Sequence, residues 1–361
     1  GLYEEMSQLR RRKLHQKVLD LLEEHFQGKK GDFVEDLFYH AFSARNFSKA
    51  FLYGIQCASK AVSTHGFEEA PRYFEEAFKA FEELEPDKKE LYFSPFVESS
   101  LTYAEILTYL GRYEEAFKTL YALPESARQK EGLGFIQYKK GNLSEALNLY
   151  EKAFQLTHDL VLKSRIKSGM CEVLFSQGEF QSALKGAQEA HGFAKEAQSQ
   201  SMEALALKNL GNYHYYQGNT SEALFFYKRS LSCFKSLGDF RGMATTLNNI
   251  GLCHYWDKKY KVALKIFIKA KKICEEIGFQ PLHIQILNNI GSLYFNDRQL
   301  RLAEEYFSKC LTAAEDKGDV SVQMASYLNL GSIFENSDTG KSEEYFFKGY
   351  ELSKNTGERN Q

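Results

Sequence analysis

The stretch LNNIGLCHYWDKKYKVAL, from Leu247 to Leu264, returns as LNNIGSLYFNDRQLRLAE from Leu287 onward. Two sets of residues repeat at intervals of 40 positions, namely Gly211, Gly251, Gly291 and Gly331, and Asn209, Asn249, Asn289 and Asn329. A fixed period of this size indicates supersecondary units that stack on one another along the chain. The first expectation is therefore a repeat protein.

Each unit carries apolar residues at i, i+3 and i+7, which lie on one stripe of a helix. A glycine follows the second apolar residue, and after a turn come an alanine and then an aromatic residue, as in Leu247, Ile250, Gly251, His254, Ala263 and Phe267. Small residues at fixed places predict that two helices approach closely there, because a larger side chain would hold the backbones apart. The pattern thus predicts an all-α solenoid of helix-turn-helix pairs.

The turns have their own spacing, with a glycine five residues before an alanine at Gly111, Gly141, Gly178 and Gly218. Glycine suits the left-handed position that ends a helix. Lys258 and Arg298 keep this spacing without the glycine. We expect these two turns to carry more backbone strain.

The order Leu-Gly, aromatic, Ala, Phe resembles the tetratricopeptide repeat family. This resemblance implies a right-handed superhelical solenoid, whose usual unit is about 34 residues. Each unit here then holds about six extra residues, which we place at 238–243, 278–283 and 318–323, as a loop or as lengthened helix ends. Long units of this kind look like those in kinesin light chains, the Pins family of adaptors and bacterial peptide-sensing Rap proteins.

The chain divides by pattern into four parts. We expect an amphipathic helix over 1–30, degenerate helical repeats over 31–100, a repeat array over 101–356 with the 40-residue period from about 164, and a polar tail over 357–361. The segment from Leu2 to Glu24, with Phe38–Ala41 and Lys49, resembles the junction before the repeats of bacterial signal-transduction ATPases. This resemblance implies the carboxy-terminal sensor region of a larger signalling protein.

Composition and motifs bear on the kind of partner. A net charge of -2 provides no chain-wide basic field, so we expect neither a nucleic-acid nor a membrane partner, and we expect a cytoplasmic protein. No phosphate loop, zinc-protease, esterase or dinucleotide motif occurs in the sequence, and the six cysteines show no metal-ligand spacing. We therefore predict no enzyme activity, catalytic residue, metal site or cofactor. The sequence leaves the oligomeric state open.

The repeated asparagines are the candidate binding residues. A polar side chain is neutral to unfavourable inside a helix, and each amide offers a donor and an acceptor that suit an extended peptide. The alternative is that these amides bridge neighbouring helices and hold the stack together. The candidates for a peptide-binding groove are Asn209, Asn249, Asn289, Asn329, Asn248, Asn288, Lys208, Asn212, Tyr216, Trp256 and Asn296.

These observations predict a non-catalytic sensor module that binds a peptide or protein segment in a concave groove. The alternative is a self-contained peptide-pheromone receptor of the Rap type that also captures a response regulator. The Rap alternative predicts a compact helical bundle over residues 1 to about 60. The sensor hypothesis predicts a continuing solenoid with an exposed apolar face near Leu14, Val18 and Leu21.

Overall fold

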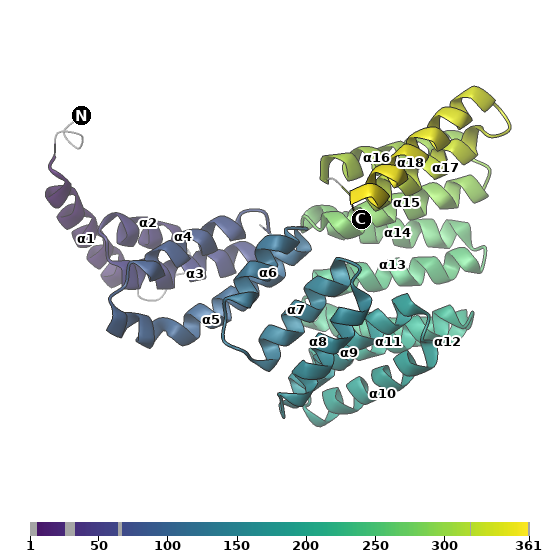
Figure 1. Ribbon diagram of the computed structural model, residues 1–361. Helices are drawn as coiled ribbons and strands as arrows, with labels where there is room; N and C mark the ends of the chain where they lie inside the picture. Colours follow the sequence, from purple (N-terminus) through teal and green to yellow (C-terminus); the bar gives the residue numbers. More distant parts are fainter. Residues whose placement is uncertain (1–5, 26–32, 64–66, 318, 360–361) are drawn as a thin grey trace. The chain divides into compact units, whose positions relative to one another are not determined.

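The computed structural model describes residues 6–25, 33–63, 67–317 and 319–359 (Figure 1). Within these ranges the chain forms 18 α-helices and no strand, so the predicted all-α solenoid class is confirmed. The helices fall into two compact units, residues 1–158 and residues 159–361, which are described separately below. In the described ranges, no helix combines the length and the apolar character needed to cross a membrane.

Unit 1 is a series of helices that pack mainly against their neighbours in sequence. Its helices are α1 (Gln8–His25), α2 (Val34–Ser43), α3 (Phe47–Ser63), α4 (Ala70–Glu82), α5 (Pro86–Tyr109), α6 (Tyr113–Tyr121), α7 (Ala127–Lys139) and α8 (Leu143–Gln155). Its core contains several aromatic rings in contact with one another, among them Phe81, which stacks on Phe96 with ring centroids 4.2 Å apart. The predicted first helix is thus present over Gln8–His25, whereas residues 1–5 and 26–30 of that prediction lie outside the described ranges.

Helix α1 buries one side and exposes the other. Leu19 is fully buried against α2, whereas Leu14 and Leu21 are 41% and 63% exposed. The carboxylate of Glu23 reaches α3, where it accepts hydrogen bonds from Lys49 and Tyr53. The pairing of α1 with α2 and of α2 with α3 continues the chain order, as a solenoid does.

Unit 2 consists of five helix pairs with a regular period (Figure 1). The first helices are α9 (Leu160–Gln177), α11 (Gln200–Tyr216), α13 (Phe240–Trp256), α15 (Gln280–Asn296) and α17 (Val320–Phe334). The second helices are α10 (Phe180–Glu196), α12 (Thr220–Leu237), α14 (Tyr260–Glu276), α16 (Leu300–Lys317) and α18 (Thr339–Arg359). Successive first helices begin 40 residues apart, which is the period read from the sequence.

The extra residues of each unit lengthen the helices instead of forming loops. Only residues 238 and 239 separate α12 from α13, and only residues 277–279 separate α14 from α15. Asp239 begins α13 as its N-cap, accepting a 2.8 Å hydrogen bond from the Gly242 amide. Of the third predicted insertion, Gly318 lies outside the described residues, as do residues 360 and 361 of the predicted tail.

The turn between two helices of a pair requires a left-handed residue. Gly178 and Gly218 adopt φ values of 77° and 76° at this position. Lys258 and Arg298 stand at the equivalent positions with φ of 59°, which costs a residue with a Cβ about 1–2 kcal/mol. The strain expected from the sequence at these two turns is therefore present.

The recurring glycines mark the helix crossings, as the pattern predicts. A Cβ added to Gly251 on α13 would lie 2.5 Å from the ring of Phe267 on α14, closer than atoms can pack. The same relationship joins three further pairs, Gly211 with Tyr227, Gly291 with Phe307 and Gly331 with Phe346. Each glycine thus allows an aromatic ring of the second helix to reach the backbone of the first helix.

Candidate functional site

The repeated asparagines form hydrogen bonds between successive first helices of unit 2. Nδ2 of Asn289 on α15 donates to Oδ1 of Asn248 on α13 at 2.9 Å. Nδ2 of Asn329 on α17 donates to Oδ1 of Asn288 on α15 at 2.8 Å. In both bridges the donor lies 41 residues after the acceptor, so one asparagine of each Asn-Asn dipeptide faces the preceding helix and the other faces the following helix.

The hydrogen bond between first helices takes a different form between α11 and α13, because a lysine occupies the acceptor position on α11. Lys208 lies 41 residues before Asn249, and an ammonium group cannot accept a hydrogen bond. Asn249 instead donates at 3.1 Å to Oδ1 of Asn212, one helical turn further along α11. The same oxygen accepts a 2.8 Å hydrogen bond from the hydroxyl of Tyr227 on α12. Asn212 therefore joins three helices.

The side chain of Lys208 faces α9, the first helix of the preceding repeat. Its ammonium group lies 2.9 Å from a carboxylate oxygen of Glu172 on α9, and its side chain is only 11% exposed. An ion pair this well covered is costly to break by removing one partner, because the other charge stays buried. The pair fixes α11 on α9 at the same level of the stack as the amide bridges.

Asn209 is the most deeply placed member of the series. It is fully buried and donates a 3.1 Å hydrogen bond to the backbone carbonyl of Ser168 on α9, while its own Oδ1 has no hydrogen-bond partner. Asn248 is also buried, at 2% exposed. Neither side chain is open to a partner, whereas Asn249, Asn289 and Asn329 are half-buried.

A second set of contacts lies at the carboxyl ends of the first helices. The indole N–H of Trp256 on α13 donates to the hydroxyl of Tyr215 on α11, and Nδ2 of Asn296 on α15 donates to the hydroxyl of Tyr255 on α13 at 2.6 Å. Both pairs are again 41 residues apart. Tyr216 stacks on Phe175 of α9 with ring centroids 5.5 Å apart. Trp256 remains 64% exposed and Tyr216 53% exposed.

The chemistry of this face is neutral. The Tyr215, Tyr227 and Tyr255 hydroxyls are neutral donors and acceptors at physiological pH, because the ordinary pKa of tyrosine is about 10 and burial raises the pKa of these three further. Within the described part of the chain, no three His, Cys, Asp or Glu side chains gather where a metal ion would need them. The arrangement is suited to hydrogen bonding and apolar contact.

For Lys208, Asn209 and Asn212, three partners were not anticipated from the sequence. These are Glu172, the Ser168 carbonyl and the Tyr227 hydroxyl, which accept from or donate to Lys208, Asn209 and Asn212 respectively. The sequence shows the period of 40 residues. It does not show that the asparagine donors lie 41 residues after their acceptors, because this offset depends on how one first helix is rotated against the next. A search for oppositely charged residues about one repeat apart would have found Glu172, which lies 36 residues before Lys208.

The sequence profile described as tetratricopeptide repeat matches residues 162–236 and 242–316. No curated protein matches the sequence. Both matched segments lie in unit 2, where the helix pairs have the period of 40 residues.

Several solved structures share the fold. A Rap protein complexed with Competence and Sporulation Factor is 14% identical, with a TM-score of 0.61 over 86% of this chain and 99% of that one. The apo form of RapI is 16% identical, with a TM-score of 0.51 over 75% and 97% of the two chains.

A further similar structure is the Signal Transduction ATPase with Numerous Domains protein with a tetratricopeptide repeat sensor from Pyrococcus horikoshii. It is 16% identical, with a TM-score of 0.54, and the match covers 98% of this chain but only 55% of that one. At such identities these likenesses concern the fold alone. The matched profile, the 40-residue helix pairs and the glycine crossings together identify tetratricopeptide repeats over residues 162–236 and 242–316 of this chain.

Proposed function

We propose that unit 2 is a non-catalytic interaction module that binds an extended peptide or protein segment along its first helices. One observation carries the proposal: half-buried amides recur at one level of successive first helices, and exposed aromatic side chains lie at the carboxyl ends of two of these helices. Asn249, Asn289 and Asn329 supply the amides, and Tyr216 and Trp256 supply exposed rings. Rings provide contact area and amides set the register of a bound backbone.

The bridges give these amides a second role, because they fix the side chains before any ligand arrives. Asn289 and Asn329 use Nδ2 in the bridge, and their carbonyl oxygens are the groups we assign to peptide N–H donors. Binding groups held in place by their neighbours lose less entropy on association. We therefore combine the two interpretations: Asn209, Asn248 and Asn288 hold the stack, and Asn249, Asn289 and Asn329 contact the ligand.

We further propose that the chain is the regulatory part of a larger cytoplasmic signalling protein. The likeness to the archaeal signal-transduction ATPase, of which this chain spans 55%, supports that placement. Of the apolar face that the sensor hypothesis predicts on α1, Leu14 and Leu21 are exposed and Val18 is half-buried, which gives the hypothesis support at two of its three positions. Ligand binding would then act by favouring one of two arrangements of the repeats. The net charge of -2 and the neutral first-helix face favour a peptide over a nucleic acid or a membrane.

A second candidate is the self-contained Rap-type receptor. It is favoured by the match to a Rap protein over 99% of that chain, a protein that was solved in complex with Competence and Sporulation Factor. Under this hypothesis unit 1 holds a response regulator while unit 2 holds the peptide. A binding assay between this chain and phosphorylated response regulators separates the two candidates.

The proposed function is tested with random linear peptides displayed on phage and selected on the immobilised protein. Selected peptides are then titrated in solution, with the fluorescence of Trp256 as the signal, because it is the only tryptophan and is largely exposed. The test variant is Phe295→Ala at the carboxyl end of the first helix α15, where Phe295 is 36% exposed and stands 40 residues after Tyr255. Its matched control is Phe225→Ala, at a residue 53% exposed on the second helix α12.

We expect Phe295→Ala to weaken the selected peptides by about tenfold, the loss typical of a contact at the centre of an interface. The control variant should bind them as the native protein does. Peptides that bind both variants equally, without any change in Trp256 fluorescence, would contradict binding at the first helices.

A further inference from the structure

The second helices α12 and α14 present a strongly basic surface that the proposed peptide site does not use. Along α14, lysines stand at i, i+4, i+8 and i+11, namely Lys261, Lys265, Lys269 and Lys272. This spacing places all four on one face over about 16 Å of helix. Every one of them is exposed. On α12, Lys228 and Arg229 are also exposed, and Arg229 stands 40 residues before Lys269.

These charges have few counter-ions. Lys272 lies 3.6 Å from Glu276, and Arg229 lies 3.6 Å from Glu203. Among the described residues, Lys228, Lys261, Lys265 and Lys269 form no ion pair within 4.0 Å. Like charges at i and i+4 destabilise a helix by about 0.2–0.5 kcal/mol for each pair. The α14 lysines therefore repel one another, and an anionic partner would remove that repulsion.

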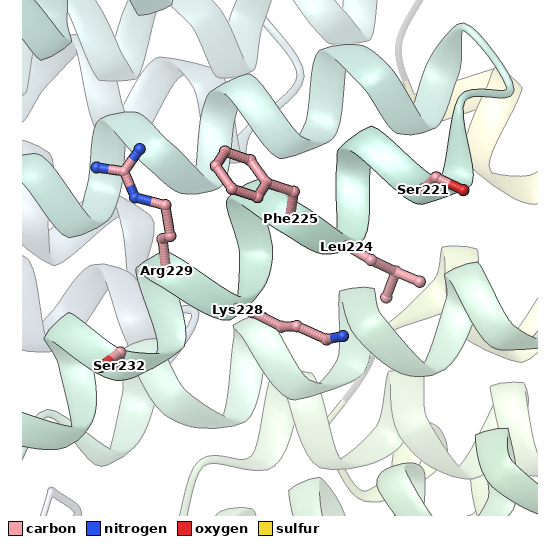
Figure 2. Close-up of a pocket in the computed structure, with 6 residues that line it drawn as sticks. All are labelled: Ser221, Leu224, Phe225, Lys228, Arg229 and Ser232. Atoms are coloured by element: carbon pink, nitrogen blue, oxygen red, sulfur yellow. The ribbon is translucent and has the colours of Figure 1, made fainter.

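An apolar depression lies on α12 beside two of these cations. It is a shallow, open pocket of about 550 Å³ lined by Ser221, Leu224, Phe225, Lys228, Arg229 and Ser232. Figure 2 shows the Phe225 ring and the Leu224 side chain on the same helix as the extended Lys228 and Arg229 side chains. Phe225 is 53% exposed, and Ile268 on α14 is 47% exposed.

The two helices pack against one core cluster. Ile266 of α14 and Leu224 and Leu231 of α12 all lie against the buried residues Ala223, Tyr227, Ile250 and Cys253. Because the repeat period is 40 residues, Phe225 and Lys265 occupy equivalent positions of their repeats, and so do Arg229 and Lys269. We call the surface formed by Phe225, Lys228, Arg229, Lys261, Lys265, Ile268 and Lys269 the α12–α14 basic face.

We propose that the α12–α14 basic face docks an acidic amphipathic helix of a protein partner. The cations match carboxylates spaced along such a helix, and the depression at Phe225 receives one large apolar side chain. A phosphate backbone would use the cations but leave the apolar centre empty. This partner differs in chemistry from the ligand of the neutral first-helix face, and the inference does not depend on that proposal.

The test uses a fluorescein-labelled helical peptide of about 16 residues built from Glu, Ala and Leu, with Leu on one face. Binding to the full chain is followed by fluorescence anisotropy. Three further probes are a peptide with Ala in place of every Leu, a single-stranded oligonucleotide, and vesicles of phosphatidylcholine with phosphatidylserine. The protein variants are Phe225→Ala and the double variant Lys265→Glu/Lys269→Glu. The charge-matched control is Lys195→Glu/Lys354→Glu, at exposed lysines outside this face.

We expect saturable binding of the Leu-containing peptide that weakens at least tenfold in Lys265→Glu/Lys269→Glu and about fivefold in Phe225→Ala. The control double variant and Phe295→Ala should bind it as the native protein does, which separates this surface from the proposed peptide site. Raising the salt from low to high concentration should weaken binding, since exposed charges are screened.

Three outcomes would overturn the inference. The first is no saturable binding of the peptide, and the second is equal loss in the test and control double variants. The third is tighter binding of the oligonucleotide or the vesicles than of the peptide, with no effect of Phe225→Ala, because that result describes a general polyanion surface.

Discussion

Asn289 on α15 and Asn248 on α13 are joined by a 2.9 Å hydrogen bond between their side-chain amides, although 41 residues separate them in sequence. Asn248 is 2% exposed, so water does not readily replace its partner. Unlike contacts within a helix pair, this bond joins two successive repeats. It therefore contributes to the coupling between repeats that gives a solenoid its cooperativity.

The first prediction concerns this bridge. We expect Asn248→Ala to lower the free energy of unfolding by about 1–2 kcal/mol, because the amide of Asn289 loses a buried acceptor. Urea unfolding of Asn248→Ala, Asn289→Ala and the double variant should give a coupling of about 0.5–1.5 kcal/mol. The exposed amide of Asn296 is the control, and Asn296→Ala should cost less. Additive losses in the first pair would show that the bridge does not stabilise the stack.

The second prediction concerns the helix crossing at Gly251. A methyl group there would meet the ring of Phe267, so Gly251→Ala should destabilise unit 2 by about 1–3 kcal/mol through overpacking. Gly192 on α10 is the matched control, because a Cβ there has no neighbouring atom within 4 Å. Gly192→Ala should raise the stability by up to about 1 kcal/mol through helix propensity. Thermal unfolding measures both, and equal effects would refute the crossing argument.

The third prediction exchanges residues between two equivalent turns. Lys258 has φ of 59° and Gly218 has φ of 76°. Lys258→Gly should stabilise the turn by up to about 1 kcal/mol, since the relief of left-handed strain exceeds the added freedom of the unfolded chain. Gly218→Lys should destabilise by about 1 kcal/mol for the same reason. Chemical unfolding of both variants measures these changes in the free energy of unfolding. If Gly218→Lys stabilised the protein, the left-handed conformation at these turns would not be a source of strain.

The fourth prediction concerns acid sensitivity of unit 2. Burial lowers the pKa of His191, His254 and His283 below the ordinary value of about 6.5, and for His191 and His254 the nearby Lys195 and Lys259 lower it further. The unfolded chain therefore binds protons at these groups more readily than the folded protein. The stability that the neutral imidazoles contribute is complete above about pH 6.5 and is lost as the pH falls below that value.

We expect the melting temperature to fall between pH 7.5 and pH 5.5, and His283→Gln to make that fall smaller. The interval stays above the range in which most carboxylates titrate, so the loss belongs mainly to the histidines. Differential scanning calorimetry at several pH values measures it. A melting temperature that rises towards pH 5.5 in the native protein would contradict the direction of these pKa shifts.

The sequence could predict the placement of Gly251 and Phe267, because that contact lies within one helix pair and depends on local spacing alone. It could also predict the left-handed turns at Lys258 and Arg298, since their position follows from the glycines at equivalent places. It was less informative about the residues added to each unit. Two explanations were open there, and the structure shows that the added residues extend the helices.

The sequence by itself therefore determined the repeat period, the helix pairs and the small residues at their crossings. The tertiary structure decided which polar side chains meet, because partners such as Asn289 and Asn248 or Lys208 and Glu172 depend on the rotation of one helix against the next. It also decided that Ile266 of α14 and Leu224 of α12 pack against one core cluster, since only stacking brings both helices to it. Local spacing fixes contacts within a repeat, and packing geometry fixes contacts between repeats.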